Sequence, residues 1–232
     1  MTQPAPMRTV FETLRPQPFS TGSAATARDP IVEPRWAGVR VLAGVDDDGV
    51  VLTDENGTTI EDQQRILYAL AAAAISAVSL ILDGYLTKQV LHDEAGVYTG
   101  LKMPSTGALI GQQMTGVRRN RAKESAEQKE ADIEARTFRP DEPVSFVATD
   151  LLLLDDESLL TVPLLERRRL LDSVLVEGDV VRLGAYIRPP IETWVGSWRS
   201  QGFDGLTFKA ANSRYSPGVA KSDWVSTGMP RR

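Results

Sequence analysis

Short apolar runs separated by turn residues dominate the first part of the chain. Val39 to Val45 is an apolar run, Asp46 to Gly49 has the composition of a turn, and Val50 to Thr53 is apolar again, which predicts a β-hairpin. Asn56-Gly57 is a second turn signal, and Thr58 to Ile60 follows it. This region is therefore expected to form antiparallel strands.

A helical pattern follows and then gives way to strand. Glu61 to Ser76 is predicted to be a helix with acidic residues in its first turn, as the helix dipole prefers. Ser79 to Leu82 is predicted to be a buried strand that ends at Asp83-Gly84, and Leu86 to Leu91 continues it. The glycines between Asp93 and Thr115 indicate a loop with a short helix.

The C-terminal half alternates strands with amphipathic helices. The predicted strands are Val144 to Leu154, Val180 to Ile187, Gly205 to Ala210 and a short strand that begins at Trp224. Pro163 starts a helix with Glu166 to Arg169 on its polar face. The apolar face of this helix contains Leu164, Leu165, Leu170, Leu171 and Val174. Ile191 to Gln201 is a second helix, whose Trp194 and Trp198 are typical of core packing rather than of base stacking.

The mixture of strands and helices predicts an α+β fold, with antiparallel sheets flanked by helices, rather than a doubly wound sheet. Met1 to Pro30 is rich in Pro, Thr and Ser and lacks a long apolar segment. This stretch is expected to be an extended or partly disordered, flexible arm without a signal peptide. A domain from residue 31 to residue 232 is expected to follow it.

Val117 to Arg139 (about 117-139) is a strongly charged insert within this domain. Its first part is basic and contains Arg118, Arg119, Arg121 and Lys123. Its second part, Glu124 to Glu134, is mostly acidic. Such a segment is typical of a solvated helix or a mobile linker, and the alternative is an arm that contacts phosphate groups or a partner.

Composition narrows the classes of function. The net charge of the 232 residues is -5, which argues against a dedicated non-specific nucleic-acid binder, although a local basic patch is compatible with it. The absence of cysteine and the single histidine, His92, exclude disulfides, thiolate ligands and multi-histidine metal sites. The most apolar stretch, Ile66 to Leu82, is short for a membrane span, so a cytoplasmic protein without membrane contact is expected.

The segment from Glu33 to Arg40, with the sequence E-P-R-W-A-G-V-R, resembles the nucleophile motif E-x-K-x-D-G-x-R of ATP-dependent DNA ligases. Glu33, Gly38 and Arg40 fit this motif. Arg35 stands at the position of the reactive lysine, which in the family attacks the α-phosphorus of ATP, and Ala37 stands at that of the aspartate. An arginine stays protonated and its lone pairs are delocalised, so Arg35 can hold a phosphate or a carboxylate but is a very poor nucleophile.

Further segments resemble family motifs in the same order, from about Val32 to the C-terminus, and the bacterial repair-type branch is the most similar. The architectural segments are Leu109 to Met114 for L-Q-Q-R-M, Pro163 to Arg168 for P-L-x-x-R-R and Tyr215 to Gly218 for Y-x-P-G. The motif E-G-x-x-x-K is nearly intact as Asp204 to Lys209. The resemblance implies the ligase-type nucleotidyltransferase (adenylation) fold.

The remaining motifs have lost the residues that would carry chemistry. In the S-R-N-G motif, Glu55 replaces the cation, and in L-D-G-E, Tyr85 replaces the carboxylate that serves the ribose and the metal. In F-V-A-F-D-L-L, Thr149 replaces the phenylalanine that stacks on adenine. In W-x-K-x-K, Ser226 and Gly228 replace both lysines. The resemblance thus implies an adenylation domain with degenerate catalytic motifs.

The family uses ATP and Mg²⁺, and the resemblance implies a former nucleotide pocket. Its residues would be Glu33, Arg35, Arg40, Asp83, Tyr85, Thr149, Asp204 and Lys209. Because Arg35 is a degenerate nucleophile, no catalytic residue, no metal site and no cofactor is predicted. Arg35 is expected to pair with Asp83 or Asp204 and to fill the pocket. The C-terminal oligonucleotide-binding domain of ligases is expected to be absent.

Three functions remain open at the level of the sequence. The first is a pseudoenzyme that binds or scaffolds a protein partner in DNA repair or recombination. The second is a nucleotide or DNA-end sensor, with Arg35, Arg40 and Lys209 as phosphate cations and the basic run as a weak DNA contact. The third is an active ligase or nucleotidyltransferase that uses a displaced lysine, for which Lys209 is the candidate.

Overall fold

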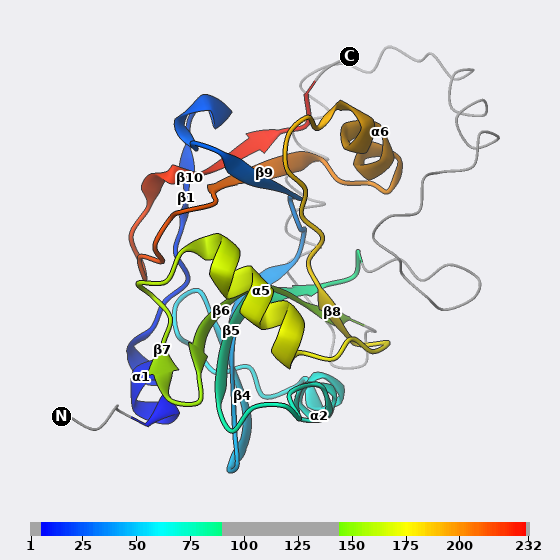
Figure 1. Ribbon diagram of the computed structural model, residues 1–232. Helices are drawn as coiled ribbons and strands as arrows, with labels where there is room; N and C mark the ends of the chain where they lie inside the picture. Colours follow the sequence, from blue (N-terminus) through cyan, green and yellow to red (C-terminus); the bar gives the residue numbers. More distant parts are fainter. Residues whose placement is uncertain (1–5, 90–143, 231–232) are drawn as a thin grey trace.

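Two β-sheets form the frame of the molecule in a computed structural model that describes residues 6–89 and 144–230 (Figure 1). The smaller sheet has the strand order β1 (Phe19–Thr21), β10 (Lys221–Gly228), β9 (Gly205–Ala210) and β2 (Pro30–Pro34). The larger sheet has the order β4 (Gly49–Asp54), β3 (Val39–Asp46), β5 (Leu80–Thr87), β6 (Ser145–Leu154) and β7 (Glu157–Ser158). A further strand, β8 (Val181–Leu183), pairs with β6.

The helices are arranged around these sheets. They are α1 (Met7–Thr13), α2 (Gln64–Ala73), α5 (Leu164–Val174) and α6 (Glu192–Ser200), with a short 3₁₀ turn at Ala24–Thr26. Figure 1 shows α6 beside the smaller sheet, α1 and α2 at the larger sheet, and α5 across the middle of the molecule. The predicted α+β fold is confirmed, and most strand pairs are antiparallel; the exceptions among the described strands are β1–β10 and β6–β8, which are parallel.

The N-terminal stretch differs from the expectation of an extended, partly disordered arm. Its described part forms α1 and β1, and Met7, Phe11 and Leu14 are buried in one core cluster. These three residues lie at i, i+4 and i+7, which is the spacing of one helix face. Gly44 of β3 makes room for this helix, because an added Cβ would lie 2.9 Å from the Phe11 ring. The prediction of a flexible arm relied on the many Pro, Thr and Ser residues of this stretch. It overlooked the few apolar residues that pack into the core.

The central strand β5 runs without interruption through Asp83-Gly84, where the sequence predicted an end. Its pairing with β6 shifts register between these two residues. A Cβ at Gly84 would lie 2.4 Å from the carbonyl oxygen of Val147, so the close approach of β6 requires glycine there. The glycine therefore serves strand packing and does not end the strand.

Two other boundaries also differ from the predictions. Helix α2 begins at Gln64, so Glu61 and Asp62 precede it and its first turn contains no acidic residue. The predicted strand from Val180 to Ile187 is regular only over Val181–Leu183. Its end makes a single bridge from Ile187 to Val32 of β2 instead, which connects the two sheets. In the second case, pairing with β2 overrides the local apolar pattern.

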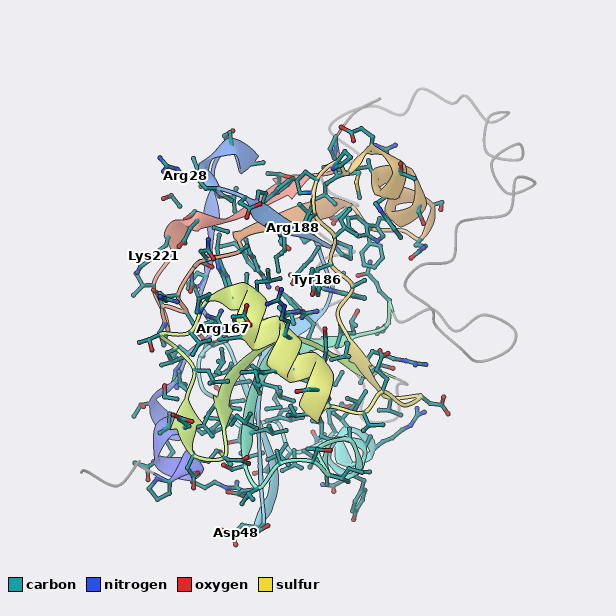
Figure 2. The ribbon with its side chains drawn as sticks, in the orientation of Figure 1. Arg28, Asp48, Arg167, Tyr186, Arg188 and Lys221 are labelled. Atoms are coloured by element: carbon teal, nitrogen blue, oxygen red, sulfur yellow. The ribbon has the colours of Figure 1, made fainter. Side chains whose placement is uncertain are left out.

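Helix α5 carries two arginines that the sequence placed on its polar face and that are in fact buried. Arg167 and Arg168 are 0% and 1% exposed. Arg167 donates two hydrogen bonds to the carboxylate of Asp150 on β6, at 2.8 and 2.6 Å. Arg168 donates to the carbonyl oxygens of Ala148 and Gly184. Figure 2 shows Arg167 on α5 in the middle of the molecule, where the helix is fixed to the larger sheet by these polar contacts.

The apolar core is divided among three clusters. The largest is formed by the larger sheet with α2 and α5, and the second contains the α1 residues together with Tyr215 and Trp224. The third lies under α6 and contains Trp198, which is 1% exposed, so its predicted role in core packing is confirmed. Within the described part of the chain, no helix is long and apolar enough to cross a membrane.

We predict that Arg167→Met lowers the free energy of unfolding by about 3–5 kcal/mol, because it leaves the carboxylate of Asp150 buried without its partner. Arg169→Met is the matched control on the same helix, since this side chain is 63% exposed and should change stability by at most about 0.5 kcal/mol. Urea unfolding measures both. Equal effects of the two substitutions would contradict the assigned role of Arg167.

Candidate functional site

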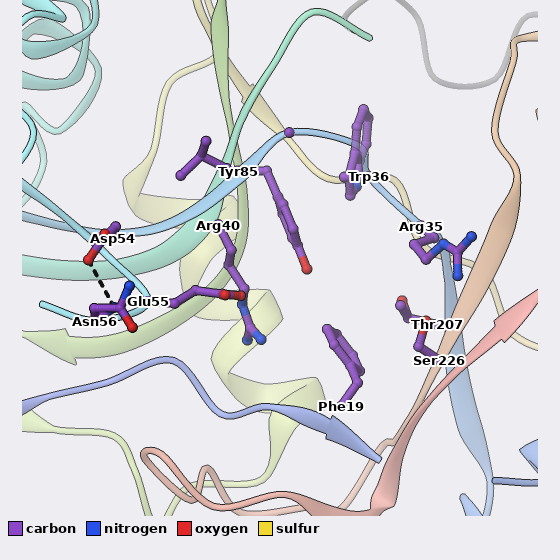
Figure 3. Close-up of a pocket in the computed structure, with 12 residues that line it drawn as sticks. Phe19, Arg35, Trp36, Arg40, Asp54, Glu55, Asn56, Tyr85, Thr207 and Ser226 are labelled. Atoms are coloured by element: carbon purple, nitrogen blue, oxygen red, sulfur yellow. Dashed lines mark hydrogen bonds between the residues drawn. The ribbon is translucent and has the colours of Figure 1, made fainter. Parts of the chain in front are cut away.

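A cavity of about 310 Å³ lies where the two sheets face each other, and side chains from both sheets line it (Figure 3). The lining residues are Phe19, Arg35, Trp36, Gly38, Val39, Arg40, Asp54, Glu55, Asn56, Tyr85, Thr207 and Ser226. Of the predicted pocket residues, Arg35, Arg40 and Tyr85 are among them. Glu33, Asp83, Thr149, Asp204 and Lys209 lie behind this lining or beside it.

Arg35 follows the end of β2 and lines the cavity from the side of the smaller sheet. Its backbone N–H donates to the carbonyl oxygen of Gly205 at 2.9 Å, which fixes its position next to β9. The guanidinium donates two hydrogen bonds to the carboxylate of Asp204, at 3.0 and 2.6 Å. Of the two expected partners, the structure therefore selects Asp204.

This ion pair does not fill the cavity as expected. The side chains of Arg35 and Asp204 are 39% and 36% exposed, so the pair lies at the rim and leaves the space of about 310 Å³ beside it. The bidentate contact directs two of the guanidinium donors of Arg35 at the Asp204 carboxylate, and the opposite charges compensate each other. Arg35 is thus a cation whose charge is already compensated.

Arg40, on β3, makes the second bidentate pair. Its guanidinium contacts the carboxylate of Asp83 on β5 at 2.9 and 2.6 Å and the carbonyl oxygen of Gln17 at 2.6 Å. Arg40 is 5% exposed and Asp83 is 0% exposed. Burial, the largest influence, would lower the pKa of Arg40. The charge of Asp83, the nearby Tyr85 and Tyr215, and the hydrogen bond to Asp83 together outweigh burial and hold this pKa well above its usual value. The cation is permanent and its partner is fixed.

The same carboxylate also connects the two sheets. The hydroxyl of Tyr215, in the loop after β9, donates to Asp83 at 2.8 Å. The backbone N–H of Gln17 donates to the oxygen of that hydroxyl at 2.9 Å, and the Gln17 side chain accepts from the backbone of Ser216. Asp83 therefore ties β3, the N-terminal segment and the smaller sheet to β5.

Lys209 forms a third pair, behind the cavity lining. Its Nζ lies 2.7 Å from the carboxylate of Glu33, and the two side chains are 1% and 2% exposed. The hydroxyl of Thr207 donates to the same carboxylate at 3.3 Å. The Lys209 Nζ also lies 4.6 Å from the centre of the Trp224 ring. Its ammonium group is thus surrounded by protein groups of the smaller sheet.

Aromatic side chains form much of the remaining wall. Phe19, Trp36 and Tyr85 all line the cavity (Figure 3). Thr149 does not, because its hydroxyl donates to the backbone oxygen of Asp83 at 3.2 Å within the larger sheet. Burial, opposed by the charge of Arg40, raises the pKa of Tyr85 above its usual range, so its hydroxyl stays protonated.

Sequence reasoning missed Phe19 and Trp36. Trp36 follows Arg35 directly in the sequence, so the motif indicated that it lies near the site. Phe19 had no comparable signal, because it reaches the site only when β1 pairs in parallel with β10. The predicted contact residues Arg118, Arg119, Arg121 and Lys123, and His92, lie outside the described residues.

Two carboxylates complete the cavity at the turn after β4. The Asp54 carboxylate accepts hydrogen bonds from the backbone N–H groups of Asn56 and Thr58, both at 2.8 Å. Burial would raise the pKa of Asp54, but these hydrogen bonds outweigh it and lower the pKa, so the group is ionised at neutral pH. Glu55 is exposed, and within residues 6–89 and 144–230 its side chain has no ion pair.

Comparison with known proteins gives concordant results. A family model described as "ATP dependent DNA ligase domain" matches residues 106–226. "Multifunctional non-homologous end joining protein LigD" of Mycolicibacterium smegmatis is 26% identical over 216 residues, which are 92% of this chain and 24% of that protein. A "DNA ligase" of Methanospirillum hungatei is 33% identical over 76 residues, or 33% of this chain and 14% of that protein. The chain thus spans about a quarter of the length of the LigD proteins that it matches.

Solved structures agree with the sequence comparison. The ligase domain from M. tuberculosis LigD superposes with a TM-score of 0.62 at 23% identity and covers 94% of this chain and 60% of that one. A "mycobacterial DNA ligase D complexed with ATP and MES" gives 0.58 at 22% identity, with 93% and 60% covered. At these identities the structural likeness establishes the fold.

We predict that Tyr85→Phe reduces the loss of stability in alkaline solution. The folded state holds the Tyr85 proton above the ordinary tyrosine pKa of 10.0, at which the unfolded chain releases it. The stabilising contribution is therefore complete below about pH 10 and is lost as the pH rises beyond it. Urea unfolding at about pH 8 and about pH 11 measures the difference.

The matched control is Tyr68→Phe, since Tyr68 is 76% exposed. The free energy of unfolding of this control should fall with pH as steeply as that of the unaltered protein. Tyr215, whose pKa is also raised by burial, contributes a similar loss in every variant. An alkaline loss in Tyr85→Phe equal to that of the control would contradict the assignment.

Proposed function

The chain belongs to the ATP-dependent DNA ligase domain family, and we propose that it uses the ligase-type adenylation fold as a binding module without the adenylation reaction. In this proposal the protein is a pseudoenzyme that binds or scaffolds a partner. The observation that carries the proposal is Arg35, which occupies the position of the reactive lysine and is held by Asp204.

The chemistry of arginine supports this proposal. A nucleophilic nitrogen must lose a proton and offer a lone pair to the α-phosphorus, and lysine does this when its surroundings lower its pKa. A guanidinium stays charged and its lone pairs are delocalised. The bidentate contact with Asp204 at 3.0 and 2.6 Å holds Arg35 as a cation in a structural role.

The surroundings of Lys209 disfavour its use as a nucleophile in place of the lysine that is missing at position 35. This side chain is 1% exposed and its Nζ lies 2.7 Å from the carboxylate of Glu33. Attack would require the amine to leave that carboxylate, lose its proton and reach a substrate in the cavity, of whose lining Lys209 is no part. Each of these steps removes a stabilising contact, so catalysis through Lys209 is disfavoured.

The residues around the cavity do not fit ATP with Mg²⁺. Phosphate groups need uncompensated cations, and both lining arginines are already in bidentate pairs. Asp54 and Glu55 would repel the phosphate chain. Within the described ranges, no group of three or more His, Cys, Asp or Glu residues could hold a metal ion. We therefore propose no cofactor.

The proposed setting is DNA repair or recombination in the cytoplasm. The names of the relatives refer to non-homologous end joining and to DNA ligase. A protein partner is favoured over direct DNA binding because the chain has a net charge of -5. A DNA-end sensor is the second candidate, favoured by the family and by the basic run that contains Arg118, Arg119, Arg121 and Lys123.

We predict that incubation with α-labelled ATP and Mg²⁺ leaves no label on the protein after denaturing electrophoresis, with an active ATP-dependent ligase as the positive control. Arg35→Lys should also remain unlabelled, because Glu55, Tyr85 and Ser226 still replace the groups that would serve the nucleotide. A labelled band from the unaltered protein would contradict the proposal. Its loss in Lys209→Arg, which keeps the charge opposite Glu33, would then identify Lys209 as the nucleophile.

The second candidate has its own test. We predict that a nicked or blunt-ended DNA duplex shows no gel shift with this chain, even at low salt, where phosphate contacts are strongest. A shift that weakens steeply as the salt concentration rises would contradict this prediction and favour the DNA-end sensor over the protein-binding module.

A further inference from the structure

The cations around the cavity are compensated by carboxylates. Arg35 pairs with Asp204 at the rim, and Arg40 pairs with Asp83 in the interior. These contacts are bidentate, so each guanidinium directs two of its donors at a protein carboxylate. An anionic ligand would therefore meet cations whose charge is already compensated, since Arg35 and Arg40 are the only arginine or lysine side chains in the described part of the lining.

Within residues 6–89 and 144–230, two carboxylates of the lining have no cationic partner of this kind. Asp54 is held by backbone N–H groups, and Glu55 is exposed at the turn after β4. Figure 3 shows the side chain of Glu55 extending from this turn toward the other labelled residues. The lining residues together with their ion-pair partners therefore carry a net negative charge. This balance favours a cation as the guest.

The aromatic wall favours the same class of guest. The faces of aromatic rings attract cations such as guanidinium and ammonium groups. Phe19 and Tyr85 already interact in this way with Arg40, whose guanidinium carbon lies 5.0 and 6.0 Å from their ring centres. Trp36 provides a third ring in the lining. Aromatic faces together with nearby carboxylates are a combination that recognises positively charged groups.

The size of the cavity limits the guest. Pockets for small ligands measure roughly 300–1,000 Å³, and this one, at about 310 Å³, lies at the lower end of that range. It therefore suits one long side chain or a small amine better than a large molecule.

We propose that the cavity binds a guanidinium or alkylammonium group and that Glu55 selects its charge. The group belongs to a free amine or to an arginine or lysine side chain of a partner protein. This inference rests on the proposed function, because an adenylating site would need its cations free for phosphate. In this proposal, a cationic guest takes the place of the negatively charged ATP that the ligase family binds.

The test is NMR of the tryptophan indole N–H signals, of which the chain has four. The Trp36 signal is assigned by its absence in Trp36→Phe. The probes are N-acetyl-arginine-N-methylamide, its neutral isostere with citrulline, butylguanidinium and ATP. The arginine probe and butylguanidinium should shift the Trp36 signal, whereas the citrulline probe and ATP should not. Tighter binding of capped arginine assigns a protein side chain as the source, and tighter binding of butylguanidinium assigns a free small cation.

Glu55→Gln should weaken binding of the arginine probe by about two- to fivefold, as expected for loss of an exposed charge contact. Glu55→Arg should abolish it. Glu61→Gln is the control, because Glu61 is exposed and does not line the cavity. Glu55 lies in an exposed turn, so the variants should melt like the unaltered protein. A Trp36 signal unmoved by every cation, equal binding of the citrulline probe, or equal weakening in Glu61→Gln would overturn the proposal.

Failure of this inference is distinguishable from failure of the proposed function. A covalent label from ATP would contradict the pseudoenzyme, whatever the cavity binds. Reversible binding of ATP at Trp36 in preference to the arginine probe, without a covalent label, would overturn the cation site and the proposal that the cavity takes no nucleotide, but not the absence of the adenylation reaction.

Discussion

The structure depends on the pairing of buried cations with carboxylates. Arg40 with Asp83, Lys209 with Glu33 and Arg167 with Asp150 are all almost fully removed from solvent. A buried charge without its partner is strongly unfavourable, so each of these pairs fixes the elements that carry it. Arg40 and Asp83 join β3 to β5, and Tyr215 and Gln17 extend the contact to the smaller sheet and the N-terminal segment. Arg167 fixes α5 to β6 in the same way.

These pairs also give the cavity walls their shape. Arg40 with Asp83 joins strands within the larger sheet, Lys209 with Glu33 joins strands within the smaller sheet, and all these charges are committed to one another. Arg35 extends the same principle to the rim, where Asp204 compensates it. Ion pairs within the protein therefore stabilise the walls of the cavity. What remains unpaired in the described lining is acidic, at Asp54 and Glu55.

Much of the architecture was predictable from the sequence, for identifiable reasons. The hairpin β3–β4 and strand β9 follow from apolar runs bounded by turns, and α5 begins at Leu164, directly after the expected Pro163. Arg167 and Arg168 were misassigned because a helical pattern ranks arginine as polar. Asp150, which interrupts an otherwise apolar strand, was the available sign of a buried partner.

The site was less predictable than the fold, because its contacts join distant parts of the chain. The motifs placed Arg35 and Asp204 in one pocket, and the pair is found. Phe19 enters through a parallel pairing with β10 that no local pattern indicates. Thr149 was expected in the pocket, but its hydroxyl is bound to the backbone of β5. Local spacing thus identifies which residues matter, while tertiary contacts decide where they point.

The most direct test of the account is a crystal structure grown with excess ATP and Mg²⁺. We expect the guanidinium of Arg40 to remain on Asp83 and the ammonium of Lys209 to remain on Glu33, with no nucleotide phosphate on either cation. A phosphate bound to Arg40 or Lys209, with the corresponding ion pair broken, would contradict the claim that these cations are committed to carboxylates of the protein.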